Sequence, residues 1–585
     1  MTIDVFEPDA ELLEISRKMS NVSIHRKPTS DGDSSIKLES LSTMKYILTT
    51  TCDNDKIYKS ARNIRKYLTQ GHSDEKSVND ILELNILSTI KELLQKSFSN
   101  TDIKFECAWI ITNIAAGTTE QTEAIVNAGL VDALLNCLRD SYASLDLKAQ
   151  VAWALGNIAG ESPRYREELM NRQFTQLMVE ILTDIFDQTF DDSLDNISYH
   201  QSVFRFPDEE YYANVESLLW ALSNMCRGGF CVAEHYSSYL PVFEILSKYI
   251  KFDYPKFEAE VCWGLSRILY NMHNVREFHQ HNEITPELCE RLANMLEYKQ
   301  PKVIVPALRT VVNITSGPND CIYGLLKTNL LSSLTRLLDP MIPNEIRKDA
   351  YLIIGNLAAG PEDMIRHVIE HKLVLINVVN HICVPGHIYN EVSYSWEPTL
   401  THAYYQKNDE WKVTKEALWI VFNIISLGSD ATVSQFIQEF PTVHIKLAAL
   451  LHYFNAPLQV CEKTVEGIIS LIQRSNKLVG EHFEGCKNRF VQELIEAGVH
   501  KIIPAVQNAH HHDGLKDLCS KLDNLLRASE EDLSKTLTDI CGMASAFGLP
   551  TIKEIQSKGN KRRVLRGLED GDVRLIENAV GNLCI

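Results

Sequence analysis

Apolar residues recur along this chain at the spacing of amphipathic helices. Segments such as 127–135, 328–338 and 496–503 carry apolar residues at i, i+3, i+4 and i+7, which places them on one face of a helix. Gly and Asn residues between these segments indicate turns. No series of segments alternates apolar and polar residues as strands do. The pattern therefore predicts a chain of helices joined by turns.

A short phrase repeats at a fixed interval within this helical pattern. It reads Ala-Trp-x-x-x-Asn at 108–113 and 152–157, and looser copies end at 224, 267, 313, 356 and 423. The intervals are 43–46 residues, except for two of 67 that contain insertions at about 184–211 and 384–411. An all-helical repeat of about 40–47 residues is typical of armadillo and HEAT proteins, whose units stack around a long concave groove. We predict an all-α, right-handed superhelical solenoid of about ten armadillo repeats over residues 56–527.

Tryptophan is concentrated at one position of the repeat, which holds five of the seven Trp residues. A single Trp there would be read as a core residue, but a core would also accept Leu, Phe or Met. The recurrence instead favours a ladder of exposed indoles, each beside the Asn four residues later on the same helical face. An Asn amide can pair with a peptide backbone, and indoles attract the side chains of Lys and Arg. We expect this ladder to bind an extended basic peptide.

The segments Phe105–Thr122, Gln150–Pro163 and 215–228 resemble importin-α, the adaptor family that binds nuclear localisation signals in its armadillo groove. The resemblance extends over residues 56–527. It implies that the key lysine of a signal is held by the Gly117 carbonyl, the Thr122 hydroxyl and the Glu161 carboxylate. With the nearby acid Glu260, the expected major peptide-binding site comprises Trp109, Asn113, Gly117, Thr122, Gln150, Trp153, Asn157, Glu161, Trp220, Asn224, Glu260 and Trp263.

A second, minor peptide-binding site is also implied by the resemblance, with more departures from the family pattern. Its expected residues are Arg309, Asn313, Asn356, Glu416, Trp419 and Asn423. Leu352 replaces an expected Trp, Ile322 replaces a lysine-binding Thr, and Arg267 replaces a Tyr and adds positive charge. We expect a weak or altered minor site, and poor binding of signals that need both sites.

Charge changes this picture in two places. The chain has 77 acidic and 58 basic residues, a net charge of -19, which argues against nucleic acid and favours a positively charged partner. The acidic insertion at 184–211 is either a solvated loop or an arm that attracts basic cargo. Residues 1–55, predicted to be a poorly ordered arm, hold six basic and ten acidic residues. Importin-α begins with a strongly basic arm that recruits importin-β, so that recruitment stays open but disfavoured.

The remaining segments add little chemistry. Residues 528–585 are expected to form a C-terminal helical extension, and its basic cluster at 561–563 is either a surface patch or an internal mimic of a signal. No apolar run is long enough to span a bilayer. No catalytic motif, cofactor fingerprint or Cys pair with metal-ligand spacing is present.

Together these patterns predict a nuclear import adaptor of the cytoplasm and nucleus. It would bind cargo proteins with basic nuclear localisation signals, use no cofactor or metal, and contact neither nucleic acid nor membrane. The alternative is an armadillo scaffold or chaperone for basic proteins that does not recruit importin-β. An enzyme is the least favoured class, because the sequence holds no catalytic constellation.

Overall fold

A computed structural model describes residues 36–70, 75–96, 100–189, 208–228, 236–272, 284–385, 387–390, 395–398, 410–453, 456–482 and 488–527. The expectations for residues 1–35, for most of the acidic insertion and for 528–585 lie outside these ranges. Among the described residues, no helix combines the length and apolarity that crossing a membrane requires.

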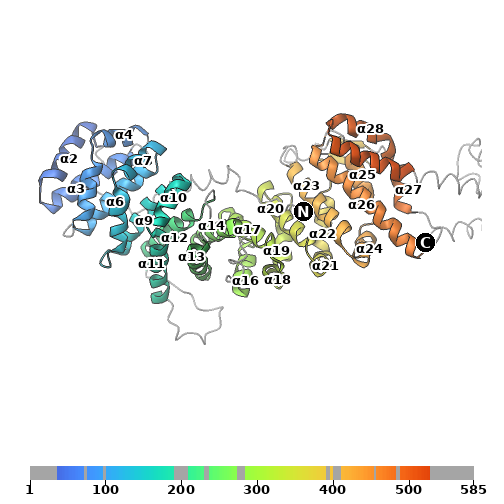
Figure 1. The fold of residues 1–585 in the computed structure, drawn as a ribbon, viewed down its shortest axis with the longest axis horizontal. Helices are drawn as coiled ribbons and strands as arrows, with labels where there is room; N and C mark the ends of the chain where they lie inside the picture. Colours follow the sequence, from blue (N-terminus) through green and yellow to red (C-terminus); the bar gives the residue numbers. More distant parts are fainter. Residues whose placement is uncertain are drawn as a thin grey trace, which may run out of the picture. The chain divides into compact units, whose positions relative to one another are not determined.

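One long helix recurs in every repeat, and we call these the central helices. The described residues contain ten: α3 (Asn54–Gln70), α6 (Thr101–Ala115), α9 (Leu145–Glu161), α12 (Glu209–Met225), α14 (Pro255–Met272), α17 (Pro301–Thr315), α20 (Asn344–Ala358), α23 (Glu410–Leu427), α26 (Leu458–His482) and an unlabelled helix over 513–527 (Figure 1). The predicted all-α armadillo fold of about ten repeats is confirmed.

Other helices, most of them shorter, connect the central helices. Up to residue 329 they are η1 (Leu38–Ser40), α2 (Leu41–Thr50), α4 (Glu75–Glu83), α5 (Leu87–Gln95), α7 (Thr119–Asn127), α8 (Leu130–Arg139), α10 (Pro163–Asn171), α11 (Phe174–Thr189), α13 (Tyr236–Tyr249), α16 (Pro286–Met295) and α18 (Asn319–Leu326). Beyond it they are α19 (Leu330–Leu337), α21 (Glu362–Glu370), α22 (Lys372–Asn380), α24 (Asp430–Glu439), α25 (Val443–Leu451), α27 (Arg489–Glu496) and α28 (Val499–His510). Helix α2 packs on α3, so the last part of the segment assigned to the N-terminal arm is helical.

Local sequence explains where these helices begin and end. Ser144 and Asp208 cap α9 and α12 by accepting backbone N–H bonds, which satisfies donors that have no partner within the helix. Thr118 and Gln121 form a capping box at the start of α7. Gly129, between α7 and α8, has a φ of 69°, a conformation that glycine adopts without steric cost. Caps and turns of this kind divide each repeat into its separate helices.

The second insertion contains the one sheet of the described residues. Strands β1 (His387–Asn390) and β2 (Ser395–Pro398) pair antiparallel, with Tyr389 opposite Trp396. The sequence pattern did not predict them, because four residues are too few to show a clear alternation. The hairpin is a local addition and leaves the helical repeat unchanged.

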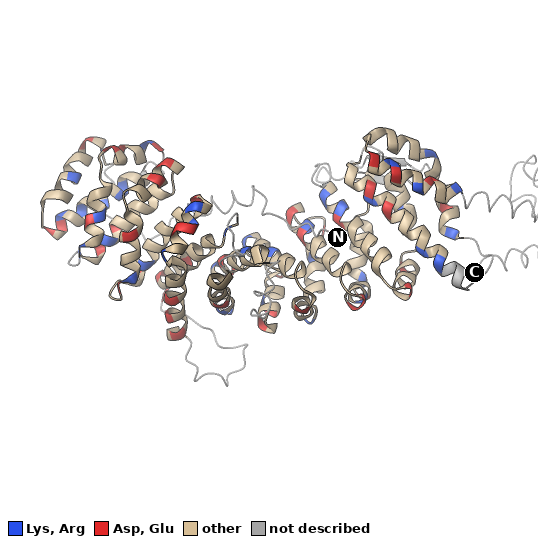
Figure 2. Ribbon diagram, in the orientation of Figure 1, with Lys and Arg blue, Asp and Glu red and all other residues tan. Residues whose placement is uncertain are grey.

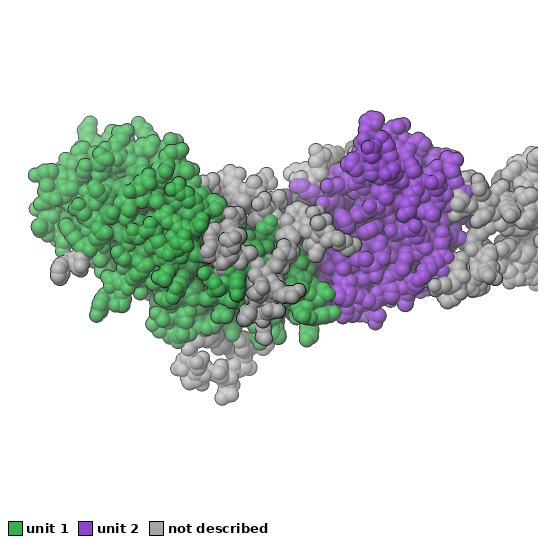
Figure 3. Space-filling view, in the orientation of Figure 1, with its two compact units in different colours: residues 1–329 green, residues 330–585 purple. Residues whose placement is uncertain are grey.

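Two compact units divide the chain, unit 1 over residues 1–329 and unit 2 over residues 330–585 (Figure 3). In unit 1 the central helices α3, α6, α9, α12, α14 and α17 pack in succession, and in unit 2 α20, α23 and α26 do so. The core between them consists of small and branched side chains such as Ile111, Leu155 and Leu222, all fully buried. Stacked repeats therefore bury a continuous apolar layer, as armadillo units require. Charged side chains are spread over the helices of both units, with acidic ones along α11 (Figure 2).

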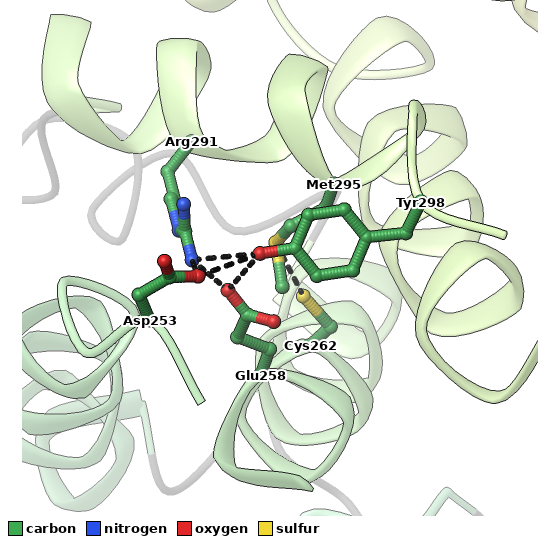
Figure 4. A network of polar contacts seen from close by, with 6 residues as sticks. All are labelled: Asp253, Glu258, Cys262, Arg291, Met295 and Tyr298. Carbon is green, nitrogen blue, oxygen red and sulfur yellow. Dashed lines mark hydrogen bonds and ion pairs between the residues drawn. The ribbon is translucent and has the colours of Figure 1, made fainter. Parts of the chain in front are cut away.

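A partly buried polar network joins the start of α14 to α16 and the residues after it (Figure 4). Arg291 donates to Asp253 at 2.8 Å and also contacts Glu258, whose side chain is 0% exposed. The Tyr298 hydroxyl oxygen lies 2.8 and 3.2 Å from oxygens of the same two carboxylates, and its one hydrogen can be donated to either. Burial raises the pKa of Glu258 to about 7, and the Arg291 charge opposes that rise. The network ties neighbouring repeats of unit 1 through charge as well as apolar contact.

Candidate peptide-binding face

The predicted tryptophans lie on consecutive central helices of unit 1. Trp109, Trp153, Trp220 and Trp263 come from α6, α9, α12 and α14, and each indole is partly exposed while its neighbours along the helix are mostly buried. We call these four residues, with Asn113, Asn157 and Asn224, the Trp/Asn face. In unit 2, Trp419 on α23 is also partly exposed. The structure thus places these indoles at the surface of the core rather than inside it.

The Asn side chains have a structural role that sequence reasoning missed. Asn157 Nδ2 donates to the Thr112 carbonyl at 3.1 Å, and Asn224 Nδ2 donates to the Gly156 carbonyl at 3.2 Å. The same bond recurs at 2.8 and 3.2 Å in two later repeats, from Asn313 to Ser266 and from Asn423 to Gly355. In each case the acceptor precedes the equivalent position of the previous repeat by one residue. Each amide therefore links neighbouring central helices. Asn157 is partly exposed, so its second N–H and its oxygen remain for a peptide, whereas Asn224 and Asn423 are only 2% and 6% exposed. Asn313 Nδ2 also donates to the Ser266 hydroxyl at 3.1 Å.

Arg267 takes the place of Asn in this ladder. Its Nη1 donates to the Ser223 carbonyl at 2.8 Å, which is the acceptor that the spacing of the ladder predicts, and to the Ser223 hydroxyl at 3.1 Å. The guanidinium carbon lies 5.4 Å from the centre of the Trp263 ring. Arg267 is only 6% exposed. It was expected to add positive charge along the peptide path, and the structure instead uses it to connect α14 with α12.

Two of the three groups expected to hold a lysine are at the surface. Gly117 and Glu161 are partly exposed, whereas Thr122 is fully buried and its hydroxyl donates to the Ala115 carbonyl at 3.4 Å. A different hydroxyl, that of the exposed Thr119, donates to Glu161 Oε1 at 2.5 Å. Sequence reasoning missed Thr119, although its place two residues after Gly117 could have suggested it. The accessible acceptors here are the Gly117 carbonyl and the Glu161 carboxylate.

Gln150 is placed away from the surface. It is 5% exposed, and its Nε2 donates to the Thr112 hydroxyl at 2.8 Å across the contact between α9 and α6. The Thr112 hydroxyl in turn donates to the Ala108 carbonyl at 2.9 Å. Gln150, expected as a peptide contact, therefore serves in this structure as a buried link between two central helices.

The acidic residues near the tryptophans differ in their surroundings. Glu260 is partly exposed and accepts from the Ser223 hydroxyl at 3.3 Å. Burial raises the pKa of Glu260 to about 7, and the Arg267 charge opposes that rise. In unit 2, Glu416 is nearly fully buried, lies 3.6 Å from Lys415, and has a pKa that burial raises above its usual range. Glu161 is thus the carboxylate best placed at the surface of the face.

The indoles of unit 1 have unequal neighbours. Trp153 and Trp220 contact each other edge to face, with ring centres 6.4 Å apart. The guanidinium carbon of Arg65, on α3, lies 4.1 Å from the centre of the Trp109 ring. Arg65 is held there by Glu106, whose Oε2 accepts from its Nε at 2.5 Å. A cation of the chain itself therefore covers one face of the first indole of the ladder.

The expected minor site is distributed over both units. Arg309 and Asn313 lie on α17 of unit 1, whereas Asn356, Glu416, Trp419 and Asn423 lie on α20 and α23 of unit 2. Arg309 is mostly buried, and Ile322 is a core side chain. Leu352 is partly exposed on α20. Asn423 is only 6% exposed, so three residues of this set, Arg309, Glu416 and Asn423, are mostly buried.

A family model and a solved structure are similar to this chain. Residues 118–160 match the Armadillo/beta-catenin-like repeat family. An engineered protein of known structure superposes with a TM-score of 0.61 at 18% identity, covering 83% of this chain and 99% of its own, which supports the fold. These two matches agree with the armadillo fold described above.

Sequence relatives narrow the class. The chain is 25% identical over 336 residues to importin subunit alpha-1a of Oryza sativa subsp. japonica, covering 55% of each chain. It is 30% identical over 302 residues to importin subunit alpha-7 of Arabidopsis thaliana, covering 51% of this chain and 50% of the relative. It thus spans about half the length of the curated relatives it matches. These similarities support a divergent importin-α-like protein.

Proposed function

We propose that this protein is a nuclear import adaptor that binds Lys/Arg-rich nuclear localisation signals of cargo proteins as extended peptides and acts in the cytoplasm and nucleus. The observation that carries the proposal is the Trp/Asn face, with Gly117 and Glu161 beside it on unit 1. Similarity to proteins named importin subunit alpha supports it. The net charge of -19 favours basic partners.

The chemistry of the face suits lysine. The methylene stem of a lysine packs against an indole such as Trp153, and the ammonium is attracted to the ring. The Gly117 carbonyl and the Glu161 carboxylate then accept the ammonium N–H groups, and the bond to a carboxylate is the stronger because both partners are charged. The free N–H and oxygen of Asn157 pair with the peptide backbone, which holds the peptide without reading its sequence.

A calorimetric titration with a peptide containing one Lys-rich cluster tests this proposal. The double substitution Trp153→Ala and Asn157→Ala should abolish binding, and Glu161→Gln should weaken it by about 10- to 100-fold, because a charge-assisted bond is lost. Trp411→Ala is the matched control, since that indole belongs to unit 2, contacts Tyr453 and is not part of the Trp/Asn face. Circular dichroism checks that each variant is folded. Unchanged affinity in a folded double variant would exclude the face as the binding site.

A second candidate function is a scaffold or chaperone that shields basic proteins without recruiting importin-β. The observation that favours it is the acidic composition of residues 1–55, with ten acidic and six basic residues. Both candidates require the Trp/Asn face, so peptide binding does not separate them. A pull-down of the full chain with importin-β does, because only the import adaptor should retain it at physiological salt.

A further inference from the structure

Lys463 of α26 lies directly over the indole of Trp419 in unit 2. Its Nζ is 3.5 Å from the centre of the Trp419 ring and 4.3 Å from that of Phe422. Attraction between a cation and a ring is significant within about 6 Å, so both contacts are close. Glu466, one turn further along the helix, accepts from Nζ at 2.5 Å, and the Lys463 side chain is only 12% exposed. The ammonium is thus held by two rings and a carboxylate of its own chain.

Other groups that would hold a basic peptide in unit 2 are also engaged within the chain. Glu416 is buried and its nearest cation is Lys415. The carbonyl of Gly428, the glycine that follows the Trp419 helical phrase as Gly117 follows the Trp109 phrase, accepts from Arg474. An incoming cation would therefore meet an indole and a carbonyl that already have cationic partners.

Unit 1 differs at the equivalent positions. No Lys or Arg of the described chain stacks on Trp153 or Trp220, whose rings contact each other. Within the same described ranges, no side chain donates to the Gly117 carbonyl, in contrast to that of Gly428. Arg65 covers a face of Trp109 on α6, and Arg267 lies 5.4 Å from the centre of the Trp263 ring on α14, so these cations of the chain are at the two ends of the ladder in unit 1. The open cation-binding groups of the repeat are therefore concentrated around Gly117 and Trp153.

We propose that Lys463 is a built-in occupant of the Trp419 site, and that it restricts the binding of basic peptides to unit 1. This inference rests on the proposed function. It assigns to Lys463 the role of a specificity-determining residue, because a signal with a second basic cluster gains no affinity over a signal with one. A second basic cluster could bind at Trp419 only by displacing Lys463 from its rings and from Glu466, so the cluster would add little to the affinity.

The position of Lys463 can be tested without any peptide. Lys463 and Lys477 lie on the same helix, but the Lys477 side chain is 52% exposed and pairs with Asp430 at 2.7 Å. Brief acetylation of the full chain with a water-soluble active ester, followed by peptide mapping, compares the two amines. Lys463 should react several times more slowly than Lys477, and Trp419→Leu should remove much of that protection. Equal rates in the unsubstituted protein would overturn the proposal.

The consequence for specificity is tested by titrating peptides with one and with two basic clusters. The unsubstituted protein should bind both with the same affinity, whereas Lys463→Ala should bind the two-cluster peptide tighter by about 2- to 30-fold, the range expected for one cation–π contact. Lys477→Ala is the control for the loss of a charge from α26 and should show no such gain. An unchanged affinity of folded Lys463→Ala for the two-cluster peptide would overturn the proposal. Failure of the unsubstituted protein to bind either peptide would refute the proposed function instead, and the acetylation result would still report on Lys463.

Discussion

Replacing Gly156 by Ala tests how closely α9 and α12 approach beneath the Trp/Asn face. A Cβ added at Gly156 would lie 2.7 Å from Cζ3 of Trp220 and 3.0 Å from Cα of Ala221. The first neighbour is a rigid ring and the second is backbone, so the helices must separate or the indole must move. Such overpacking costs about 1–3 kcal/mol, and the better helix propensity of Ala returns about 0.5–1 kcal/mol. We expect the free energy of unfolding to fall by about 1–2 kcal/mol.

Gly355 provides a matched control with the opposite expected sign. Like Gly156, it precedes a ladder Asn, and its carbonyl accepts from the Asn of the next repeat. A Cβ at Gly355 would meet only Ile420 Cγ1, at 3.6 Å, which is an ordinary contact. Because no neighbour must move, Gly355→Ala should only gain the higher helix propensity of Ala over Gly. The substitution should therefore stabilise unit 2 by about 0.5–1 kcal/mol.

The assay must resolve the two units, since a chain with two compact units need not unfold in one step. Urea unfolding followed by circular dichroism measures the overall change, and hydrogen exchange with mass spectrometry measures local opening. Gly156→Ala should speed exchange in α9 and α12, and Gly355→Ala should slow exchange in α20 and α23. Destabilisation by both substitutions, or by neither, would refute the argument from the close approach at Gly156.

Two further predictions concern the carboxylates Glu258 and Glu260, whose pKa values are both raised. Glu258→Ala should lower the free energy of unfolding by about 3–5 kcal/mol, because Arg291 loses a buried partner. Asp253→Ala, which removes a side chain that is 81% exposed and bound to the same guanidinium, should cost less than about 1 kcal/mol in the same urea titration; equal losses would contradict the role given to burial. Because burial raises the pKa of Glu260 from 4.5 to about 7, the carboxylate loses its charge on acidification, and affinity for a Lys-rich peptide should fall as the pH drops through about 7. A raised carboxyl pKa stabilises the fold below about pH 4.5, and this contribution is lost as the pH rises through about 7. Glu260→Gln should therefore flatten the pH profiles of both peptide affinity and stability, and profiles unchanged from those of the unsubstituted protein would show that another group titrates.

Much of the fold could be predicted because it is local. The spacing of apolar residues indicates one face of a helix. The recurrence of Trp and Asn, mostly every 43–46 residues, indicates a stacked repeat. The hairpin formed by β1 and β2 was not predicted, because its strands are too short to show an alternation of apolar and polar residues. Its pairing depends on contacts across a turn.

The candidate site was predicted less completely, because the type of a residue does not show how deeply its side chain is buried. Gln150 and Thr122 are polar and lie near the Trp phrases, yet the structure buries both and pairs them within the chain. Thr119, which lies two residues after Gly117, provides the hydroxyl that contacts Glu161. A helical period assigns a face to each residue, but the neighbouring repeat decides how much of that face remains open.

The sequence by itself determined the helical repeat, the placement of Trp and Asn at one phase, and an acidic chain suited to basic partners. All three depend on spacing and composition along the chain. Only the tertiary structure decided which of those indoles and carbonyls are open. Arg65 reaches Trp109 and Lys463 reaches Trp419 across more than forty residues of sequence, and no local pattern marks such a contact. The contact arises because each repeat packs its central helix against that of the next repeat. This packing brings a cation of one repeat onto the ring of its neighbour.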